Sequence, residues 1–176
     1  MSTDPRAYPD RPFLAVSAAI IRDGRVLLTQ RARGPANRVW TMPGGVVEAG
    51  ETLSEALIRE IDEETKIKIE PVALAGHREV VMRDASGRPE RHFVIMCFAS
   101  RWISGEPQLN EELADARWVE LSELSQYKTT DGLAPIVAAA SSSLRSGSPE
   151  IQRDAKHMMT KCRSGRPDAS RTTTSR

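Results

Sequence analysis

The sequence predicts an α/β domain in which a mixed sheet lies between helices, an α/β/α sandwich. Three observations support this fold class. The run from 13 to 21 is almost continuously apolar, as expected for a strand that is covered on both faces. The glycine pair 44–45 precedes an acidic amphipathic helix, which we expect from about Thr52 to Thr65. Two further apolar stretches, 71–82 and 92–102, predict a strand hairpin with a long polar tip.

The N-terminal part of the sheet follows from turn signals. Residues 1–12 contain three prolines and several charges, and we expect them to form a flexible arm. Asp23-Gly24 is a two-residue hairpin signal, so the chain returns as a second strand over 25–31. Residues 34–39 are expected to be a loop, after which the chain leads into the glycine pair.

The acidic helix carries its own start signal. Thr52 lies at the expected N-cap and Glu55 follows three residues later, which is the capping-box pattern. Lys66 at the C-terminal end suits the helix dipole. The apolar face is formed by residues at three- and four-residue spacing, Leu53, Ala56, Leu57 and Ile61.

The C-terminal half completes a domain over 13–144. A brief strand is expected over 116–121, and a last helix follows Asp131 on the face of the sheet opposite the acidic helix. Residues 145–176 carry eight Arg or Lys against three acids, a net charge of +5, and we expect a largely disordered basic tail. A nucleic-acid contact by this tail is the alternative, but aromatic residues are absent from it.

Composition excludes several classes of protein. The net charge of +1 does not call for nucleic acid, and no apolar run is long enough to span a membrane. The N-terminus lacks the apolar core of a signal peptide. Two cysteines, Cys97 and Cys162, lie far apart without metal-ligand spacing, so we expect a reduced cytoplasmic location.

The acidic helix is the candidate for chemistry. Glu60, Glu63 and Glu64 stand at i, i+3 and i+4, so their side chains share one patch of the helix. Like charges at this spacing repel one another, and a hard cation such as Mg²⁺, or Mn²⁺ in its place, would neutralise them. Arg59 lies within the cluster and can orient a carboxylate through a forked ion pair. A solvated acidic face is the alternative; the preceding glycines, whose backbone can approach an anion or a metal, favour a site.

This stretch resembles the Nudix box, the signature of a family of hydrolases. In register with that pattern are Gly45, Glu51, Arg59, Glu60, Ile61, Glu63, Glu64 and Ile67. Lys66 departs from it, because the family usually has glycine there. We expect this departure to remove the usual left-handed cap of the helix without breaking the fold.

The resemblance implies hydrolysis of a phosphoanhydride in a nucleoside diphosphate linked to another group, with a nucleotide-type small molecule as substrate. ADP-ribose or a related nucleotide sugar is the favoured substrate, and oxidised nucleoside triphosphates are the alternative. A domain that binds a nucleotide or RNA without cleaving it is a third reading. Matching the family's metal ligands are Glu60, Glu63, Glu64 and the backbone of Gly44, with Arg59 orienting the glutamates and Glu51 in the outer shell.

The residue that accepts the proton of the attacking water is either a glutamate of a loop outside the Nudix box or a glutamate of the box itself. We expect Glu112, with Glu111 as runner-up, to take the proton or to add a metal contact from a loop beside the start of the acidic helix. The alternatives are a solvated loop and a base role for Glu63 or Glu64.

Substrate contacts are predicted at three further positions. Arg78 and Arg91 lie near the hairpin tip and are candidates to hold a phosphate or ribose, with a solvated tip as the alternative. Trp40 is a candidate to flank a base, or to pack beneath the glycine turn. We expect neither a membrane nor a nucleic acid as partner, and we also consider a homodimer.

Overall fold

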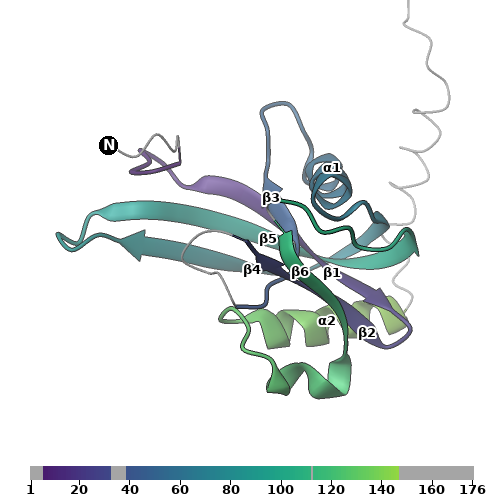
Figure 1. The fold of residues 1–176 in the computed structure, drawn as a ribbon. Helices are drawn as coiled ribbons and strands as arrows, with labels where there is room; N and C mark the ends of the chain where they lie inside the picture. The colour runs from purple at the N-terminus through teal and green to yellow at the C-terminus, as the bar shows by residue number, and fades with distance from the viewer. Residues whose placement is uncertain (1–5, 33–38, 112, 147–176) are drawn as a thin grey trace, which may run out of the picture.

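The computed structural model describes residues 6–32, 39–111 and 113–146. These residues form a six-stranded sheet with one helix on each face, α1 above and α2 below in Figure 1. The elements in chain order are β1 (Phe13–Arg22), β2 (Arg25–Arg31), β3 (Gly44–Val46), α1 (Leu53–Thr65), β4 (Lys68–Arg83), β5 (Pro89–Ser104), β6 (Leu113–Glu120), the 3₁₀ helix η1 (Leu121–Gln126) and α2 (Leu133–Ser146).

The sheet is mixed, as predicted. Its strand order is β4-β5-β1-β2-β6, and β3 pairs with β1 beside β2. The central pair β1–β5 is parallel, whereas the other strand pairs named here are antiparallel. The β1–β2 turn is the predicted two-residue hairpin, since Asp23 and Gly24 both have positive φ (50° and 77°) as a type I′ turn requires.

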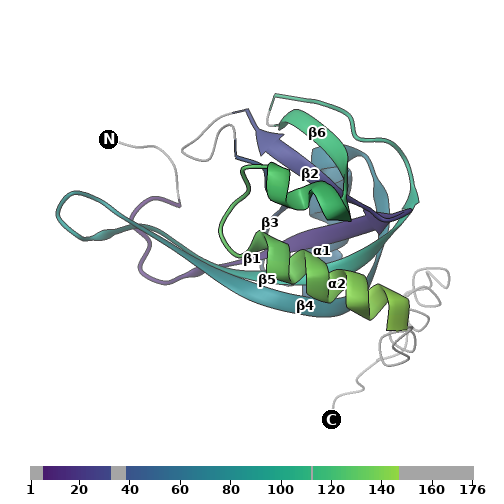
Figure 2. The ribbon, with the colours of Figure 1, turned by 90° about the horizontal axis from the view of Figure 1, so that it is seen from below.

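Alternation along β1 divides the core into two layers. Val16, Ala18 and Ile20 are buried in the cluster that includes the apolar face of α1. Ala19, one residue out of phase, is buried in the cluster that includes the apolar face of α2. The continuous apolar run in the sequence therefore reflects a central strand that is covered on both sides, as Figure 2 shows from below.

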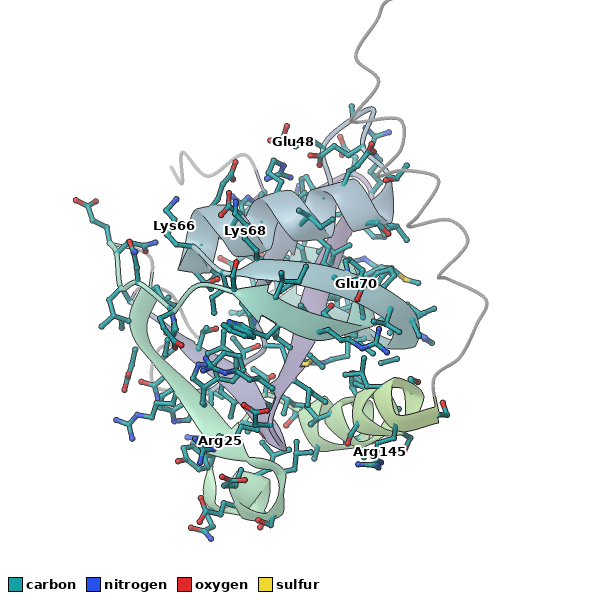
Figure 3. All side chains as sticks on the ribbon, turned by 90° about the vertical axis from the view of Figure 1, so that its right-hand side faces the viewer. Arg25, Glu48, Lys66, Lys68, Glu70 and Arg145 are labelled. Carbon is teal, nitrogen blue, oxygen red and sulfur yellow. The ribbon has the colours of Figure 1, made fainter. Side chains whose placement is uncertain are left out.

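Helix α1 begins as the sequence predicts but ends differently. The Thr52 hydroxyl accepts from the Glu55 N–H (3.3 Å) and the Glu55 carboxylate accepts from the Thr52 N–H (2.8 Å), which completes the capping box. At the other end Lys66 itself adopts the left-handed conformation, with φ 62° and ψ 17°, and its N–H donates to the Asp62 carbonyl. The expectation that replacing glycine removes the left-handed cap is therefore wrong. Figure 3 shows Lys66 at this end of α1.

Strands β4 and β5 are longer than predicted and form an arm. Pairing of β1 with β5 starts at Phe13–Phe93. The part of the hairpin between Phe93 and the β4–β5 turn therefore projects from the rest of the sheet (Figure 1). The N-terminal segment contacts this arm, because the Tyr8 N–H donates to the Glu90 carbonyl (2.9 Å). Residues 1–5 of the predicted flexible arm and residues 147–176 of the predicted tail lie outside the described residues. None of the described helices has the length and apolarity to span a membrane.

Candidate active site

A glycine turn brings β3 between β1 and α1. Gly44 pairs with Ser17 and Gly45 pairs with Val16. A Cβ atom on Gly44 would lie 2.1 Å from the Val16 carbonyl oxygen, and one on Gly45 would lie 2.2 Å from the carboxyl carbon of Glu60. Glycine is required at position 44, where a Cβ would overlap the backbone of β1, whereas a Cβ at position 45 would displace the flexible end of the Glu60 side chain.

Arg59 is the centre of the carboxylate cluster. Its Nε and Nη2 donate to the two carboxylate oxygens of Glu51 at 2.6 and 2.9 Å, a forked pair. Its Nη1 donates to Glu60 (3.0 Å) and to Glu63 (3.3 Å), and its Nη2 also donates to the carbonyl of Val46 (3.1 Å). One guanidinium therefore ties three acidic side chains to the backbone of β3.

Glu64 is held by different partners. Its carboxylate accepts from the Gly44 N–H at 2.9 Å, so the glycine turn contacts the helix through a charged hydrogen bond. The Glu64 carbonyl accepts from the Asn110 side-chain amide at 3.1 Å. The predicted site residues Gly44, Glu60, Glu63, Glu64 and Arg59 thus lie together, on the face of α1 that meets β3.

The cluster has a strong electrostatic bias. The forked pair with Arg59 lowers the pKa of Glu51 from 4.5 to about 2, with help from the Glu48 N–H. The same pair raises the pKa of Arg59 well above its ordinary value, and Glu60 adds to the shift. These groups stay ionised over the whole physiological range of pH.

The donor set is suited to a hard divalent cation. Glu60, Glu63 and Glu64 offer carboxylate oxygens, which magnesium and manganese prefer. Within the described part of the chain, no three acidic, histidine or cysteine side chains are already grouped as a metal site. Hydrogen bonds keep the three carboxylates apart, because Arg59 lies between Glu60 and Glu63 while the Gly44 N–H holds Glu64.

The acidic loop contacts the C-terminal end of α1. Asn110 reaches the Glu64 carbonyl, and the Gln108 N–H donates to the Thr65 carbonyl at 3.1 Å. The predicted place of Glu112, beside the start of the helix, falls outside the described residues, whereas Gln108 and Asn110 lie at the C-terminal end. Glu111 is exposed in this loop, whereas Glu112 lies outside the described residues.

The predicted substrate contacts have separate surroundings. Trp40 is buried and packs edge-on against Tyr127, with ring centroids 5.8 Å apart. Arg78 of β4 donates from Nη1 to the Thr130 hydroxyl at 2.9 Å. Arg91 pairs with Met82 in the hairpin arm, away from the glycine turn.

Sequence reasoning missed three contacts of the site, namely the Val46 carbonyl, Asn110 and Thr130. Asn110 carries a local signal, because asparagine next to paired acids in a loop is a common backbone-binding residue. The Arg78–Thr130 contact has no such signal, since it joins residues that lie 52 positions apart.

Comparison with known proteins supports the resemblance. The NUDIX domain family matches residues 11–140. An ADP-ribose pyrophosphatase from Methanocaldococcus jannaschii is 34% identical over 113 residues, 64% of this chain and 64% of that protein. An NAD-capped RNA hydrolase, NudC, from Vibrio parahaemolyticus is 31% identical over 130 residues, 72% of this chain and 45% of that protein. The chain thus spans less than two thirds of the length of these curated relatives.

Solved structures give the same picture. The crystal structure of a MutT NUDIX hydrolase from Burkholderia pseudomallei has a TM-score of 0.63 at 31% identity, covering 74% of this chain and 98% of that one. The NUDIX domain of Shewanella oneidensis NrtR, solved as a complex with ADP ribose, has a TM-score of 0.59 at 24% identity, covering 80% and 93%. At that lower identity the likeness concerns the fold alone.

Proposed function

Because the chain belongs to the Nudix hydrolase family, we propose that the cluster around Arg59 catalyses metal-dependent hydrolysis of a phosphoanhydride in a nucleoside diphosphate linked to another group. The observation that carries the proposal is the forked pair of Arg59 with Glu51, which also fixes Glu60 and Glu63 beside the glycine turn. A solvated acidic face would not need its charges tied to one guanidinium and to the backbone of β3.

The metal expected here is Mg²⁺, with Mn²⁺ as a substitute. Glu60, Glu63 and Glu64, with the Gly44 backbone, are the residues that would hold it. When bound, it would neutralise charge on the phosphoryl oxygens and lower the pKa of a coordinated water. Arg59 holds Glu60 and Glu63 beside the glycine turn, and their oxygens would exchange the hydrogen bonds from its Nη1 for the metal.

We propose that a glutamate of the acidic loop accepts the proton of the attacking water. Glu112 is the first candidate and Glu111 the second, with Glu63 or Glu64 as the alternative inside the helix. The contacts of Asn110 and Gln108 with the end of α1 support this choice, because they hold the loop beside Glu64.

The substrate proposed first is ADP-ribose or a related nucleotide sugar. The relative named ADP-ribose pyrophosphatase supports it. A nucleoside triphosphate is the second candidate, supported by the likeness to a MutT hydrolase. Binding without cleavage is the third reading, and the complete set of box carboxylates argues against it. A cytoplasmic location and a homodimer stay predictions from the sequence.

One assay tests the activity and separates the substrates. The chain is incubated with Mg²⁺ and ADP-ribose, NADH, a dinucleoside polyphosphate, 8-oxo-dGTP or a short NAD-capped RNA, and the products are identified by mass. We expect ADP-ribose to yield AMP and ribose 5-phosphate, and this yield to vanish in EDTA. Glu64→Gln serves as the inactive control. Turnover of 8-oxo-dGTP alone would favour the second candidate, and turnover of nothing would favour the third.

A further inference from the structure

Arg78 lies in the same cross-sheet row as the backbone that Arg59 binds. The registers of β4, β5, β1 and β3 place Arg78 opposite Ile95, Ile95 opposite Ala15, and Ala15 opposite Val46. Paired residues point to one face of a sheet, and Ile95 packs against the cluster on the α2 side. Three inter-strand spacings of about 4.8 Å separate Arg78 from Val46, or about 14 Å.

Within the described part of the chain, the hydrogen-bond partner of the Arg78 guanidinium is a hydroxyl group, and no carboxylate forms an ion pair with it. Its Nη1 donates to the Thr130 hydroxyl at 2.9 Å, and that hydroxyl lies 3.5 Å from the hydroxyl of Thr41. On the inner side lies Cys97, a thiol whose pKa is raised by burial and lowered in part by the charge of Arg78. Gly132 lies close to the Nε side, since a Cβ atom there would be in van der Waals contact with Nε at 3.8 Å.

Arg78 differs in its charge partners from two other partly buried arginines of the sheet. Within the described residues Arg78 forms no ion pair, although it is partly buried. Arg22 of β1 and Arg101 of β5, which are also partly buried, each pair with a carboxylate, Glu106 and Glu70. A cation that is partly removed from water without an anion is destabilising, unless a ligand supplies the negative charge.

We propose that Arg78, supported by Thr130, is a specificity-determining residue that binds a phosphate of the substrate remote from the anhydride that is cleaved. The inference rests on the proposed function and names the substrate class. The backbones of Arg78 and Val46 are about 14 Å apart, and Arg78 is on the α2 side of the sheet whereas α1 carries Arg59, so we infer that Arg78 binds a different phosphate from those expected at the Arg59 cluster. The ligand is therefore a second phosphate on the nucleoside side or on the group X. A 2′-phosphate on a ribose and the next phosphodiester of an RNA chain have this chemistry in common.

Matched substrate pairs test the assignment. Values of kcat and KM are measured with Mg²⁺ for ADP-ribose against its 2′-phosphorylated form, and for NADH against a short NAD-capped RNA. We expect the wild type to prefer at least one phosphorylated member by about 10-fold or more, the size of one charged hydrogen bond. The pair that shows the preference identifies the source of the phosphate.

The variants assign this preference to one side chain. In Arg78→Gln the ratio of kcat/KM between the phosphorylated member and its partner should fall to about one, chiefly through a rise in KM for the phosphorylated member. Arg78→Lys should restore part of the preference. Arg83→Gln removes an exposed charge farther along the same strand and should change neither substrate. Equal turnover of both members of each pair by the wild type, or an equal loss on all substrates in Arg78→Gln, would overturn the proposal.

Binding measurements separate this proposal from the proposed hydrolysis. Calorimetry with AMP and with adenosine 2′,5′-bisphosphate needs no turnover. Tighter binding of the bisphosphate, lost in Arg78→Gln, supports the Arg78 site even in a chain that cleaves nothing. Equal affinity for the two ligands, together with no preference for the NAD-capped RNA over NADH, overturns it even in an active enzyme.

Discussion

Two partly buried arginines of this domain have opposite surroundings. Arg59 on α1 donates to three carboxylates and a carbonyl, whereas Arg78 on β4 donates to one threonine hydroxyl. The first is fully occupied by the protein's own acids and organises them. The second has donors left over, although removing a cation from water without an anion beside it costs free energy. The difference separates an arginine that builds a site from one that is available to a ligand.

The largest effect is expected from the proposed proton acceptor, Glu112. Glu112→Gln should lower kcat by about 10²–10⁴-fold with little change in KM, the usual size of a lost general base. Steady-state rates across pH for Glu112→Gln, Glu111→Gln and the double variant check this. If all three variants keep the wild-type kcat, the base is Glu63 or Glu64, and the acidic loop takes no part in catalysis at the Arg59 cluster.

The acids around Arg59 are expected to be catalytic as well as structural. Glu63→Gln or Glu64→Gln should lower kcat by at least ~100-fold, because removing a metal ligand forfeits several kcal/mol of charge stabilisation. Folding should change little, since Glu63 is exposed and Glu64 is only partly buried. Rates in Mg²⁺ and in EDTA, with urea unfolding as the control, test this; rapid wild-type turnover in EDTA would refute the metal assignment.

Removing each arginine in turn tests the comparison directly. Arg59→Gln should lower kcat on every substrate by on the order of 10²-fold, because Glu51, Glu60 and Glu63 lose the group that positions them. Arg78→Gln should leave kcat on ADP-ribose within a few-fold. Parallel rate measurements on the two variants decide the matter, and similar losses in both would mean that the two arginines do not differ in role.

The ion pair of Arg59 with Glu51 should make stability depend on pH in the acid range. The folded-state pKa of Glu51 is about 2, below its ordinary 4.5, so its contribution is fully present above pH 4.5 and is lost as the pH falls towards 2. Urea midpoints of the wild type and of Glu51→Gln should therefore converge over this window. Glu123→Gln, which removes an exposed glutamate, is the control. A gap between wild type and Glu51→Gln that stays constant from pH 5 to pH 2 would exclude the ion pair as its cause.

The smallest effect is expected at the end of α1, away from both arginines. Lys66 holds a positive φ that favours glycine, so Lys66→Gly should raise the free energy of unfolding by about 1 kcal/mol, the relief of strain less the added entropy of the unfolded chain. Activity should stay within a few-fold of wild type. Denaturant unfolding and a rate assay check this, and a large rise in rate would show that Lys66 perturbs the Arg59 cluster.

The sequence predicted the Arg59 site better than the Arg78 site for a physical reason. Helix periodicity places Glu60, Glu63 and Glu64 on one patch whatever the rest of the chain does, and Thr52 and Glu55 mark where the helix starts. The partner of Arg78 is Thr130, which only the packing of the chain before α2 against β4 brings near. Lys66 shows the same limit, since a left-handed lysine has no signature in the sequence.

The parallel pairing of β1 with β5 has a consequence for how the chain folds. Residues 13–21 of β1 pair with residues 93–101 of β5, so the centre of the sheet joins segments 80 positions apart. Loop closure over that length makes folding slow compared with folding through local contacts. During synthesis β1, β2 and the acidic helix leave the ribosome well before β5. Until then the apolar faces of β1 have only part of their final cover, and this interval is when the nascent chain is most exposed to aggregation.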